Sequence, residues 1–190
     1  MIEIIFLGRG GQGAFTSSRI LGIAASLYEK KYSLSFPSFG PERRGAPVFA
    51  YTKISEAPIR DRSQSVKADY FVVLDESLYT PNLLERLKEN GKLLLNTETP
   101  EKYSILQDGS TNEKLITFDA LPVAQKYLGR PITNTTMLAA LVSHSELVTL
   151  ESLKAAVHYD LAPKIAEKNE RLITYFETIK SFEKGGKQDE

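Results

Sequence analysis

The sequence predicts an α/β protein with a single-domain, Rossmann-like layered fold: a mainly parallel sheet flanked by helices, and a helical C-terminal region. Short apolar runs rich in β-branched and aromatic residues alternate with segments of helical spacing, and helical segments alone fill the last third. The 190 residues are enough for one core without disulfides or metals. We expect a domain over residues 1–183 and a frayed tail over residues 184–190, which are all glycine or polar.

The first strand is expected at residues 2–7, and a helix is expected at residues 14–28. Between them lies the glycine turn, residues 8–13, with glycine at positions 8, 10, 11 and 13. Glycine allows backbone angles that are closed to other residues, and the first N–H groups of the helix have no partner within the helix. The helix dipole adds a partial positive charge there. This arrangement is typical of a phosphate site.

The arginine loop, residues 37–47, follows a second expected strand at residues 32–36. It contains three prolines and two glycines, which exclude regular structure, and it carries Arg43 and Arg44. In a parallel sheet, ligands bind at the carboxyl ends of the strands. Both the glycine turn and the arginine loop would leave the sheet at that edge, so we expect them to face each other.

The remaining elements follow from apolar periodicity and from helix start and stop signals. Residues 70–74 resemble a central strand buried on both faces, with Asp75 at its carboxyl end. Thr80 and Pro81 start a helix that Asn90 and Gly91 end. Strands are expected at residues 48–54, 92–95 and 115–118, a helical turn at 100–106, and helices at 122–127, 135–147, 150–159 and 163–182, with Asn134 as a cap of the second.

Composition excludes several kinds of function. The 24 basic and 24 acidic residues balance, so no long-range field favours nucleic acid. Without cysteine, the chain has no thiolate nucleophile, no disulfide and no cysteine ligand for an iron–sulfur cluster. His144 and His158 have no metal-ligand spacing. No signal segment or apolar run of membrane length is present, so we expect a cytoplasmic protein that does not enter a membrane.

The glycine turn matches the G-x-G-x-x-G spacing of dinucleotide-binding proteins. That interpretation also needs an acidic residue near the end of the second strand, and residues 32–39 contain none. Arginine binds phosphate through paired hydrogen bonds, and Arg9 would add a third guanidinium to Arg43 and Arg44. A nucleotide with a pyrophosphate and a further ribose phosphate would use both segments, and coenzyme A and NADP share that pattern.

Two blocks carry a resemblance to a known family: GRGGQGA at residues 8–14 and FPSFGPERRGAPV at residues 36–48. With the strand near residues 69–75 and the NTTML start of a helix at residue 134, the chain resembles the gamma subunit of the 2-oxoacid:ferredoxin oxidoreductases, especially the pyruvate-type branch. The resemblance implies an enzyme that decarboxylates a 2-oxo acid, passes the acyl group to coenzyme A and reduces ferredoxin.

By position, the resemblance implies coenzyme A contacts from the glycine turn, the following helix and the arginine loop. The residues are Arg9, Gly10, Gly11, Gln12, Gly13, Thr16, Arg43 and Arg44. It also implies alpha, beta and delta partner subunits that hold thiamine diphosphate and the iron–sulfur clusters, with the isolated gamma chain inactive. Two other hypotheses stay open: a self-sufficient NADP-dependent oxidoreductase, and a purely structural subunit whose arginine loop contacts a partner.

Overall fold

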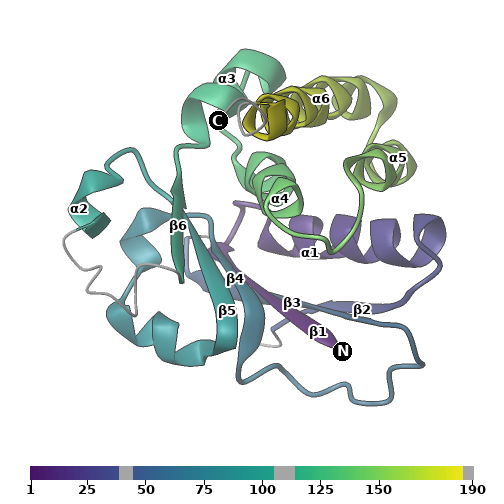
Figure 1. Cartoon of the computed structure of the whole chain (residues 1–190), viewed down its shortest axis with the longest axis vertical. Coiled ribbons are helices and arrows are strands. Elements are labelled where there is room, and N and C mark those ends of the chain that lie inside the picture. The colour runs from purple at the N-terminus through teal and green to yellow at the C-terminus, as the bar shows by residue number, and fades with distance from the viewer. Residues whose placement is uncertain (39–44, 105–113, 186–190) are drawn as a thin grey trace.

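A mixed β-sheet runs through the molecule (Figure 1). The computed structural model describes residues 1–38, 45–104 and 114–185, and every structural statement below concerns these residues. The strands are β1 Ile2–Arg9, β2 Tyr32–Pro37, β3 Pro47–Ser55, β4 Ala68–Val73, β5 Leu87–Asn96 and β6 Leu115–Phe118, in the spatial order β2-β3-β1-β4-β5-β6. Three of the five described pairings are parallel, and β3 is antiparallel to both β1 and β2. The predicted α/β class with a mainly parallel sheet is confirmed.

Both faces of the sheet are apolar at its centre. Successive side chains of a strand point to opposite faces, and the central strands carry apolar residues at successive positions. In β1, Ile4 and Phe6 belong to one hydrophobic cluster, whereas Ile5 and Leu7 belong to another. Strand β4 shows the same alternation and lies between β1 and β5. The prediction of a central strand buried on both faces is confirmed.

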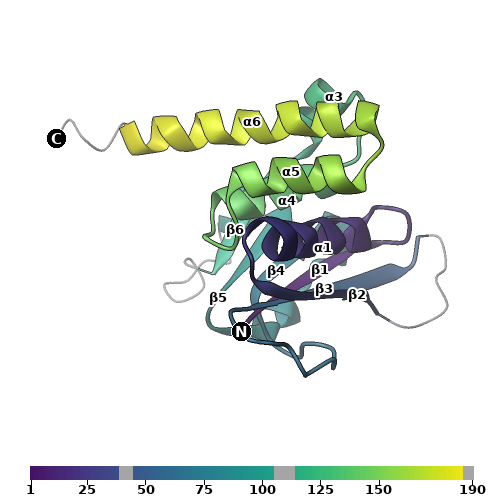
Figure 2. The same cartoon turned by 90° about the vertical axis from the view of Figure 1, so that its right-hand side faces the viewer.

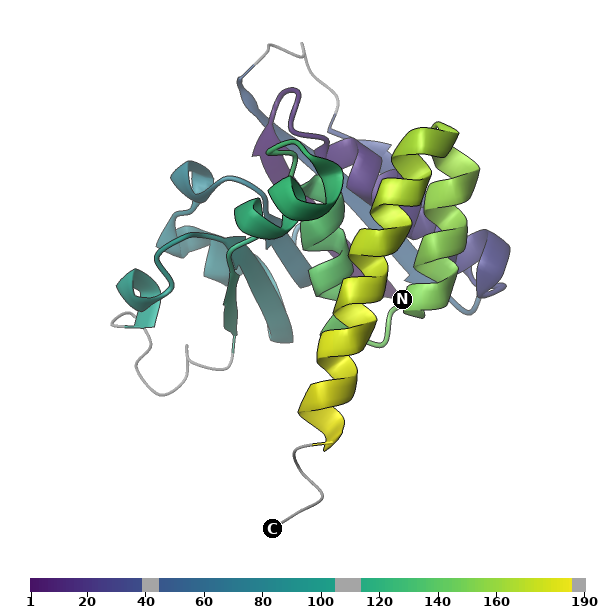
Figure 3. The same ribbon diagram turned by 90° about the horizontal axis from the view of Figure 1, so that it is seen from above.

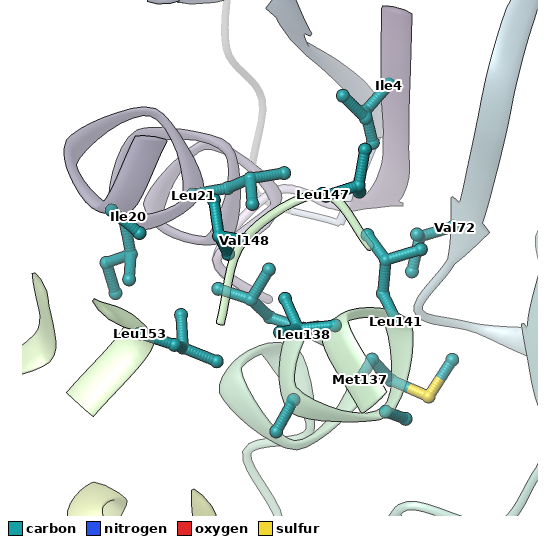
Figure 4. Packing of buried hydrophobic residues seen from close by; sticks show 14 of the residues in the cluster. Ile4, Ile20, Leu21, Val72, Met137, Leu138, Leu141, Leu147, Val148 and Leu153 are labelled. Carbon is teal, nitrogen blue, oxygen red and sulfur yellow. The ribbon is translucent and has the colours of Figure 1, made fainter. Parts of the chain in front are cut away.

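Helices cover one face of the sheet in successive layers (Figure 2). They are α1 Ala14–Ile23, the π-helix η1 Ala24–Tyr28, α3 Leu121–Leu128, α4 Asn134–Ser143, α5 Leu150–Asp160 and α6 Pro163–Gly185. In the core, Ile4 and Val72 of the sheet share one cluster with Met137, Leu138 and Leu141 of α4 (Figure 4). Helix α6 lies farthest from the sheet, and its C-terminal end projects beyond the other helices (Figures 2 and 3).

The opposite face carries a thinner layer of short elements: the 3-10 helices η2 Glu76–Leu78 and η3 Pro81–Arg86, and α2 Glu101–Ser104. Leu83 and Tyr103 pack there on Phe71 and the apolar side chains of β5. The Arg86 guanidinium lies 5.0 Å and 5.4 Å from the ring centres of Phe49 and Phe71. Cation–π contacts therefore close part of this face.

The segment after Thr80 differs from its prediction. A 3-10 helix replaces the expected α-helix, and β5 begins at Leu87 and runs through Asn90 and Gly91. A β-carbon on Gly91 would lie 2.7 Å from Ala68 O of the neighbouring strand. Gly91 thus allows two backbones to approach at a register irregularity near Ala68, and it does not end a helix.

Helix α1 starts where predicted but changes to a π-turn after Ile23. The wider turn rotates the following side chains, and Leu27 is 53% exposed. The small side chains of α1 allow the helix to pack closely on the sheet: Ser18 Oγ donates to Tyr51 O at 2.7 Å, and Ser35 Oγ donates to Ser18 O at 2.8 Å.

The C-terminal helices lie near their expected places. Helix α4 ends at Ser143, earlier than predicted, and α6 continues to Gly185, while residues 186–190 lie outside the described residues. The capping prediction for Asn134 is wrong, because Thr133 is the N-cap of α4 and Asn134 is the first residue of the helix. The Thr133 side chain makes no cap hydrogen bond. None of the described helices is long and apolar enough to cross a membrane.

Candidate functional site

The glycine turn adopts the backbone conformation that its glycines allow. Gly11 and Gly13 have φ angles of 95° and 83°, in the region that other residues rarely adopt. Gly13 is the N-cap of α1, and because glycine has no side chain, the N-cap residue supplies no side-chain hydrogen bond to the helix. The first N–H groups of α1 are therefore not bound by a capping side chain, as an anion site requires.

The side chains of Arg9 and Gln12 point to Asp75, at the end of β4. Arg9 Nε and Gln12 Nε2 donate to Asp75 Oδ2 at 3.1 and 2.8 Å. Gln12 Oε1 in turn accepts from Arg9 N at 2.7 Å, and Arg9 Nη2 donates to Ser77 Oγ at 2.7 Å. These contacts hold the turn in place and engage both side chains that were expected at a phosphate.

Asp75 is ionised at neutral pH. Its partial burial raises the pKa, but hydrogen bonds from Ser77 and Gln12 and the charge of Arg9 have the larger combined effect, so the pKa lies below its usual value. Asp75 also accepts from Ser77 N at 3.0 Å as the N-cap of η2. This carboxylate therefore caps η2.

Backbone hydrogen bonds join the arginine loop to the glycine turn. Gly10 N donates to Ala46 O at 2.8 Å, and Gly45 N donates to Gly10 O at 3.3 Å. Arg9 Nη1 adds a bond to Gly45 O at 3.0 Å. The C-terminal end of the loop therefore lies beside the turn, as expected, whereas Arg43 and Arg44 are outside the described residues.

Thr16, the other predicted contact, lies on α1 at a cavity of about 310 Å³. The cavity also meets the start of α4, where Asn134 Nδ2 reaches Gly13 O at 3.4 Å. A β-carbon on Gly13 would overlap the Asn134 amide, so α4 packs directly on the turn. Sequence reasoning missed this role of Asn134 because no local pattern connects residues this far apart in the chain.

A second cavity, of about 450 Å³, lies over the carboxyl ends of β4, β5 and β6. Its described lining includes four carboxylates, those of Asp75, Glu76, Glu98 and Asp119, and no lysine or arginine. Glu76 already accepts hydrogen bonds from Thr97, Lys102 and Tyr103. This acidic edge does not suit phosphate. Among the described residues no cluster of histidine and carboxylate side chains could hold a metal ion.

The buried polar side chains of α1 and the histidines show no catalytic arrangement. Ser17 Oγ donates to Asn134 O at 3.1 Å, which is a structural bond. His144 Nδ1 lies 2.9 Å from Ala140 O, and His158 Nε2 lies 2.8 Å from Glu170 Oε2.

Comparison with known proteins gives consistent similarities. The model of the pyruvate ferredoxin/flavodoxin oxidoreductase family matches residues 3–175. Pyruvate synthase subunit PorC of Methanothermobacter marburgensis is 47% identical over 170 residues, which cover 89% of this chain and 92% of that protein. The pyruvate/ketoisovalerate oxidoreductases common subunit gamma of Pyrococcus abyssi is 43% identical over 185 residues, covering 96% and 100%. The crystal structure of pyruvate oxidoreductase subunit PORC from Thermotoga maritima matches with a TM-score of 0.73 and 32% identity, covering 92% and 94%.

Proposed function

The chain belongs to the pyruvate ferredoxin/flavodoxin oxidoreductase family as a gamma subunit, and we propose that in the assembled enzyme it binds coenzyme A between the glycine turn and the arginine loop. The observation that carries this proposal is the pair of backbone hydrogen bonds between Gly10 and residues 45 and 46. They fix the end of the segment that contains Arg43 and Arg44 beside an uncapped helix N-terminus, so two groups of phosphate donors can act on one ligand.

The contacting residues then divide into two roles. Gly11 and Gly13 offer backbone to the phosphates, Thr16 adds a hydroxyl, and Arg43 and Arg44 bind further phosphate oxygens. Gly10 holds the end of the arginine loop beside the turn, since its backbone N–H and C=O are bonded to Ala46 and Gly45. Arg9 and Gln12 act as positioning residues, since their side chains are engaged by Asp75. Coenzyme A accepts the acyl group, and this chain orients it for the companion subunits.

The other cofactors are proposed to reside on alpha, beta and delta companion subunits. A chain without cysteine supplies no thiolate for an iron–sulfur cluster, and the sequence has no thiamine diphosphate motif. Ferredoxin would receive its electrons through the complex, in the cytoplasm. Pyruvate is the proposed 2-oxo acid, because the relatives compared above are named for pyruvate or for pyruvate and ketoisovalerate.

A self-sufficient NADP-dependent oxidoreductase is less well supported. The dinucleotide-binding fold places its second strand beside the first, whereas β3 lies antiparallel between β1 and β2 here. Asp75 and its partners occupy the region between the ends of β1 and β4, beside the acidic cavity. Both features separate this site from a dinucleotide crevice.

The test is calorimetry of coenzyme A binding to the assembled enzyme. Replacing Arg43 and Arg44 with alanine is expected to weaken binding by about 3 kcal/mol, or roughly 100-fold in Kd. Arg60 and Arg62 form a matched control, since they are exposed near the opposite edge of the sheet, and their double alanine variant should bind normally. Unchanged affinity in the Arg43/Arg44 variant, with activity retained, would favour the purely structural subunit.

Mild purification from the native source tests the assembly itself. Mass spectrometry should find subunits that bear thiamine diphosphate and iron–sulfur clusters together with this chain. An isolated monomer at every step would contradict the proposed complex.

A further inference from the structure

Strand β2 forms an open edge of the sheet in the described part of the chain. The strand order ends at β2, which pairs with β3 on one side. Edge strands of natural proteins usually carry charged side chains, a bulge or a covering element that prevents pairing with another chain. Residues 32–37, YSLSFP, contain no charge, and they pair with β3 in one continuous register. Such an edge is suited to pairing with a further strand.

The hydrogen-bonding pattern shows which backbone groups of β2 point outward. In an antiparallel pair, opposite residues exchange backbone hydrogen bonds at every second position, and the groups between them point to the other side. Ser38 N donates to Phe49 O at 2.7 Å in the same register as the ladder, so the even-numbered residues of β2 bond to β3. The N–H and C=O groups of Ser33 and Ser35 therefore point away from the sheet.

Helix α1 holds β2 on one face of the sheet (Figure 2). Ser33 Oγ donates to Gly22 O and Ser35 Oγ donates to Ser18 O, both at 2.8 Å. A β-carbon on Gly22 would overlap the Ser35 hydroxyl, so the helix packs directly on the strand. Because the helix fixes both serines, their outward backbone groups are already ordered, and pairing with another strand costs little further conformational entropy.

The opposite face of β2 carries an apolar row, because alternate side chains of a strand share a face. Tyr32 is 49% exposed, and Leu34 and Phe36 are half-buried. Phe36 stacks on Tyr51 of β3 with the ring centres 5.3 Å apart. A strand placed beside β2 would therefore extend an apolar surface that continues from β3, in addition to pairing its backbone.

The ends of β2 select one register for pairing with an identical strand. Lys31 N is already bonded to Ala25 O at 3.0 Å, and Pro37 has no N–H group. In an antiparallel pair, Ser33 opposite Ser35 of a second copy uses every outward N–H and C=O of both serines. A shift in either direction would place a serine opposite Lys31 or Pro37, neither of which has a free N–H. The outward groups of β2 are therefore complementary to themselves.

We propose that two copies of this chain pair through β2 in antiparallel orientation, so that their six-stranded sheets form one continuous sheet. The two Leu34 side chains face each other across the two-fold axis, and Tyr32 of each copy lies beside Phe36 of the other. Aromatic cross-strand pairs stabilise such ladders, and a neutral strand brings no like charges together. A surface patch that fits its own copy is typical of two-fold dimers.

The contact leaves the glycine turn free. Leu34 lies opposite Lys53 of β3, which lies opposite Glu3 near the amino end of β1, whereas the glycine turn follows the carboxyl end of β1. The contact uses none of the residues proposed to bind coenzyme A, so either proposal can fail without the other. In the assembled enzyme, the pairing would join two sets of subunits through their gamma chains.

Disulfide cross-linking tests the contact, because the chain contains no cysteine of its own. Leu34→Cys places a thiol opposite its own copy at a non-hydrogen-bonded pair, where Cα atoms are about 4.5 Å apart and can be bridged. With copper phenanthroline as oxidant, the full chain is expected to form a disulfide-linked dimer, and the assembled enzyme should give the same linked peptide by mass spectrometry. Val66→Cys, at a side chain that is 79% exposed before β4, should cross-link at least about tenfold more slowly, because its thiols meet only by diffusion.

Tyr32→Cys and Phe36→Cys test the register. Neither variant alone should cross-link, because the two copies of each residue lie several positions apart along the paired strands, whereas a mixture of the two variants should. A Leu34→Cys chain that links no faster than Val66→Cys, or that links to a companion subunit in the assembled enzyme, would overturn the proposal. A link between two Phe36→Cys chains would overturn the register.

Leu34→Glu tests the contact without a covalent bond. Two carboxylates would face each other in the ladder, so the dissociation constant of the dimer should rise at least about tenfold at neutral pH in analytical ultracentrifugation of the full chain. The new carboxylate lies opposite Lys53 within its own chain, which favours retention of the fold, and Tm checks it. Association should recover in acid as the carboxylates become neutral.

Val66→Glu is the matched control and should associate as the unmodified chain does. An unmodified full chain that stays monomeric at every concentration would contradict pairing through β2. A Leu34→Glu variant that keeps its Tm and associates as tightly as the control would contradict it as well.

Discussion

At the level of single residues, Asp75 determines the shape of the glycine turn. It accepts hydrogen bonds from Arg9 and Gln12 of the turn and from Ser77 of the next element. The carboxylate therefore replaces a ligand as the partner of two polar side chains in the turn. Because the Arg9 and Gln12 side chains are bound to Asp75, the groups proposed to contact phosphate are the backbone of the turn and the arginine loop.

Replacing Asp75 with asparagine is expected to lower the free energy of unfolding by about 1–2 kcal/mol at neutral pH, because charge-assisted hydrogen bonds weaken. The pKa of Asp75 is lowered in the folded protein, so its contribution is complete above about pH 4 and is lost as the pH falls through the folded value. Urea denaturation of both proteins across this pH range measures the difference. A difference that stays constant into acid would contradict the role of the ionised carboxylate, and Glu98→Gln, an exposed change in the same cavity, should have little effect.

Gly13→Ala tests the contact between the turn and α4. The left-handed backbone angle costs about 1–2 kcal/mol with any side chain, and overlap with Asn134 adds about 1–3 kcal/mol. Gly11→Ala is the matched control, because its φ is also positive but its β-carbon would meet no described atom within 4 Å. Chemical denaturation should show the larger loss for Gly13→Ala. Equal losses would mean that α4 does not pack on the turn.

Among the elements, α5 is joined to the end of η1 by an unusual cap. Thr149 Oγ1 accepts from Ser152 N at 3.0 Å, and Glu29 Oε1 accepts from Thr149 N at 2.8 Å. The Glu29 carboxylate thus performs the second half of a capping box from a distant part of the chain. Its pKa is lowered, chiefly by the backbone hydrogen bond from Thr149.

Glu29→Ala should destabilise the protein by about 1 kcal/mol near neutral pH, because Thr149 N and the Ser152 hydroxyl lose their acceptor. Hydrogen exchange should become faster in the first turn of α5 before other helices change. Glu146→Ala, at an exposed carboxylate nearby, serves as the control. Because the folded pKa of Glu29 is lowered, the effect should fade in acid, and an effect that grows there would contradict the capping role.

For the whole molecule, coenzyme A should raise the free energy of unfolding more than NADPH does. If the full chain retains the site, coenzyme A at about 100 times its Kd should add about 2.7 kcal/mol to the free energy of unfolding. NADPH at the same concentration should add less, because the acidic edge and the position of β3 do not suit a dinucleotide. Thermal denaturation with each ligand measures the order. A larger shift with NADPH would support the dinucleotide hypothesis instead.

The sequence predicted local structure where one segment determines it. The strand before Gly8, the helix after Gly13 and the doubly buried β4 all follow from patterns of neighbouring residues. Strand order did not follow, because the place of β3 depends on pairs such as Ile2 with Ile54 that lie far apart in the chain. Gly91 was misread since the same residue ends helices and allows close strands.

In the candidate site, too, the local features could be predicted from the sequence and the contacts between distant segments could not. The glycine turn and its approach to the arginine loop could be predicted from two local blocks and the rule for parallel sheets. The partners of Arg9 could not, because Asp75 and Ser77 come from another strand end.

The anchoring of the arginine loop also has an evolutionary consequence. Ser38 N donates to Phe49 O at 2.7 Å at one end, and Gly45 is bound to Gly10 at the other, so the sheet fixes both ends independently of the residues between them. Doubling the number of residues between two fixed ends costs only about 0.6 kcal/mol of closure entropy. Insertions or replacements between these anchors can therefore change the recognition of ligands or partner subunits while the scaffold still folds, which makes the loop an interchangeable module.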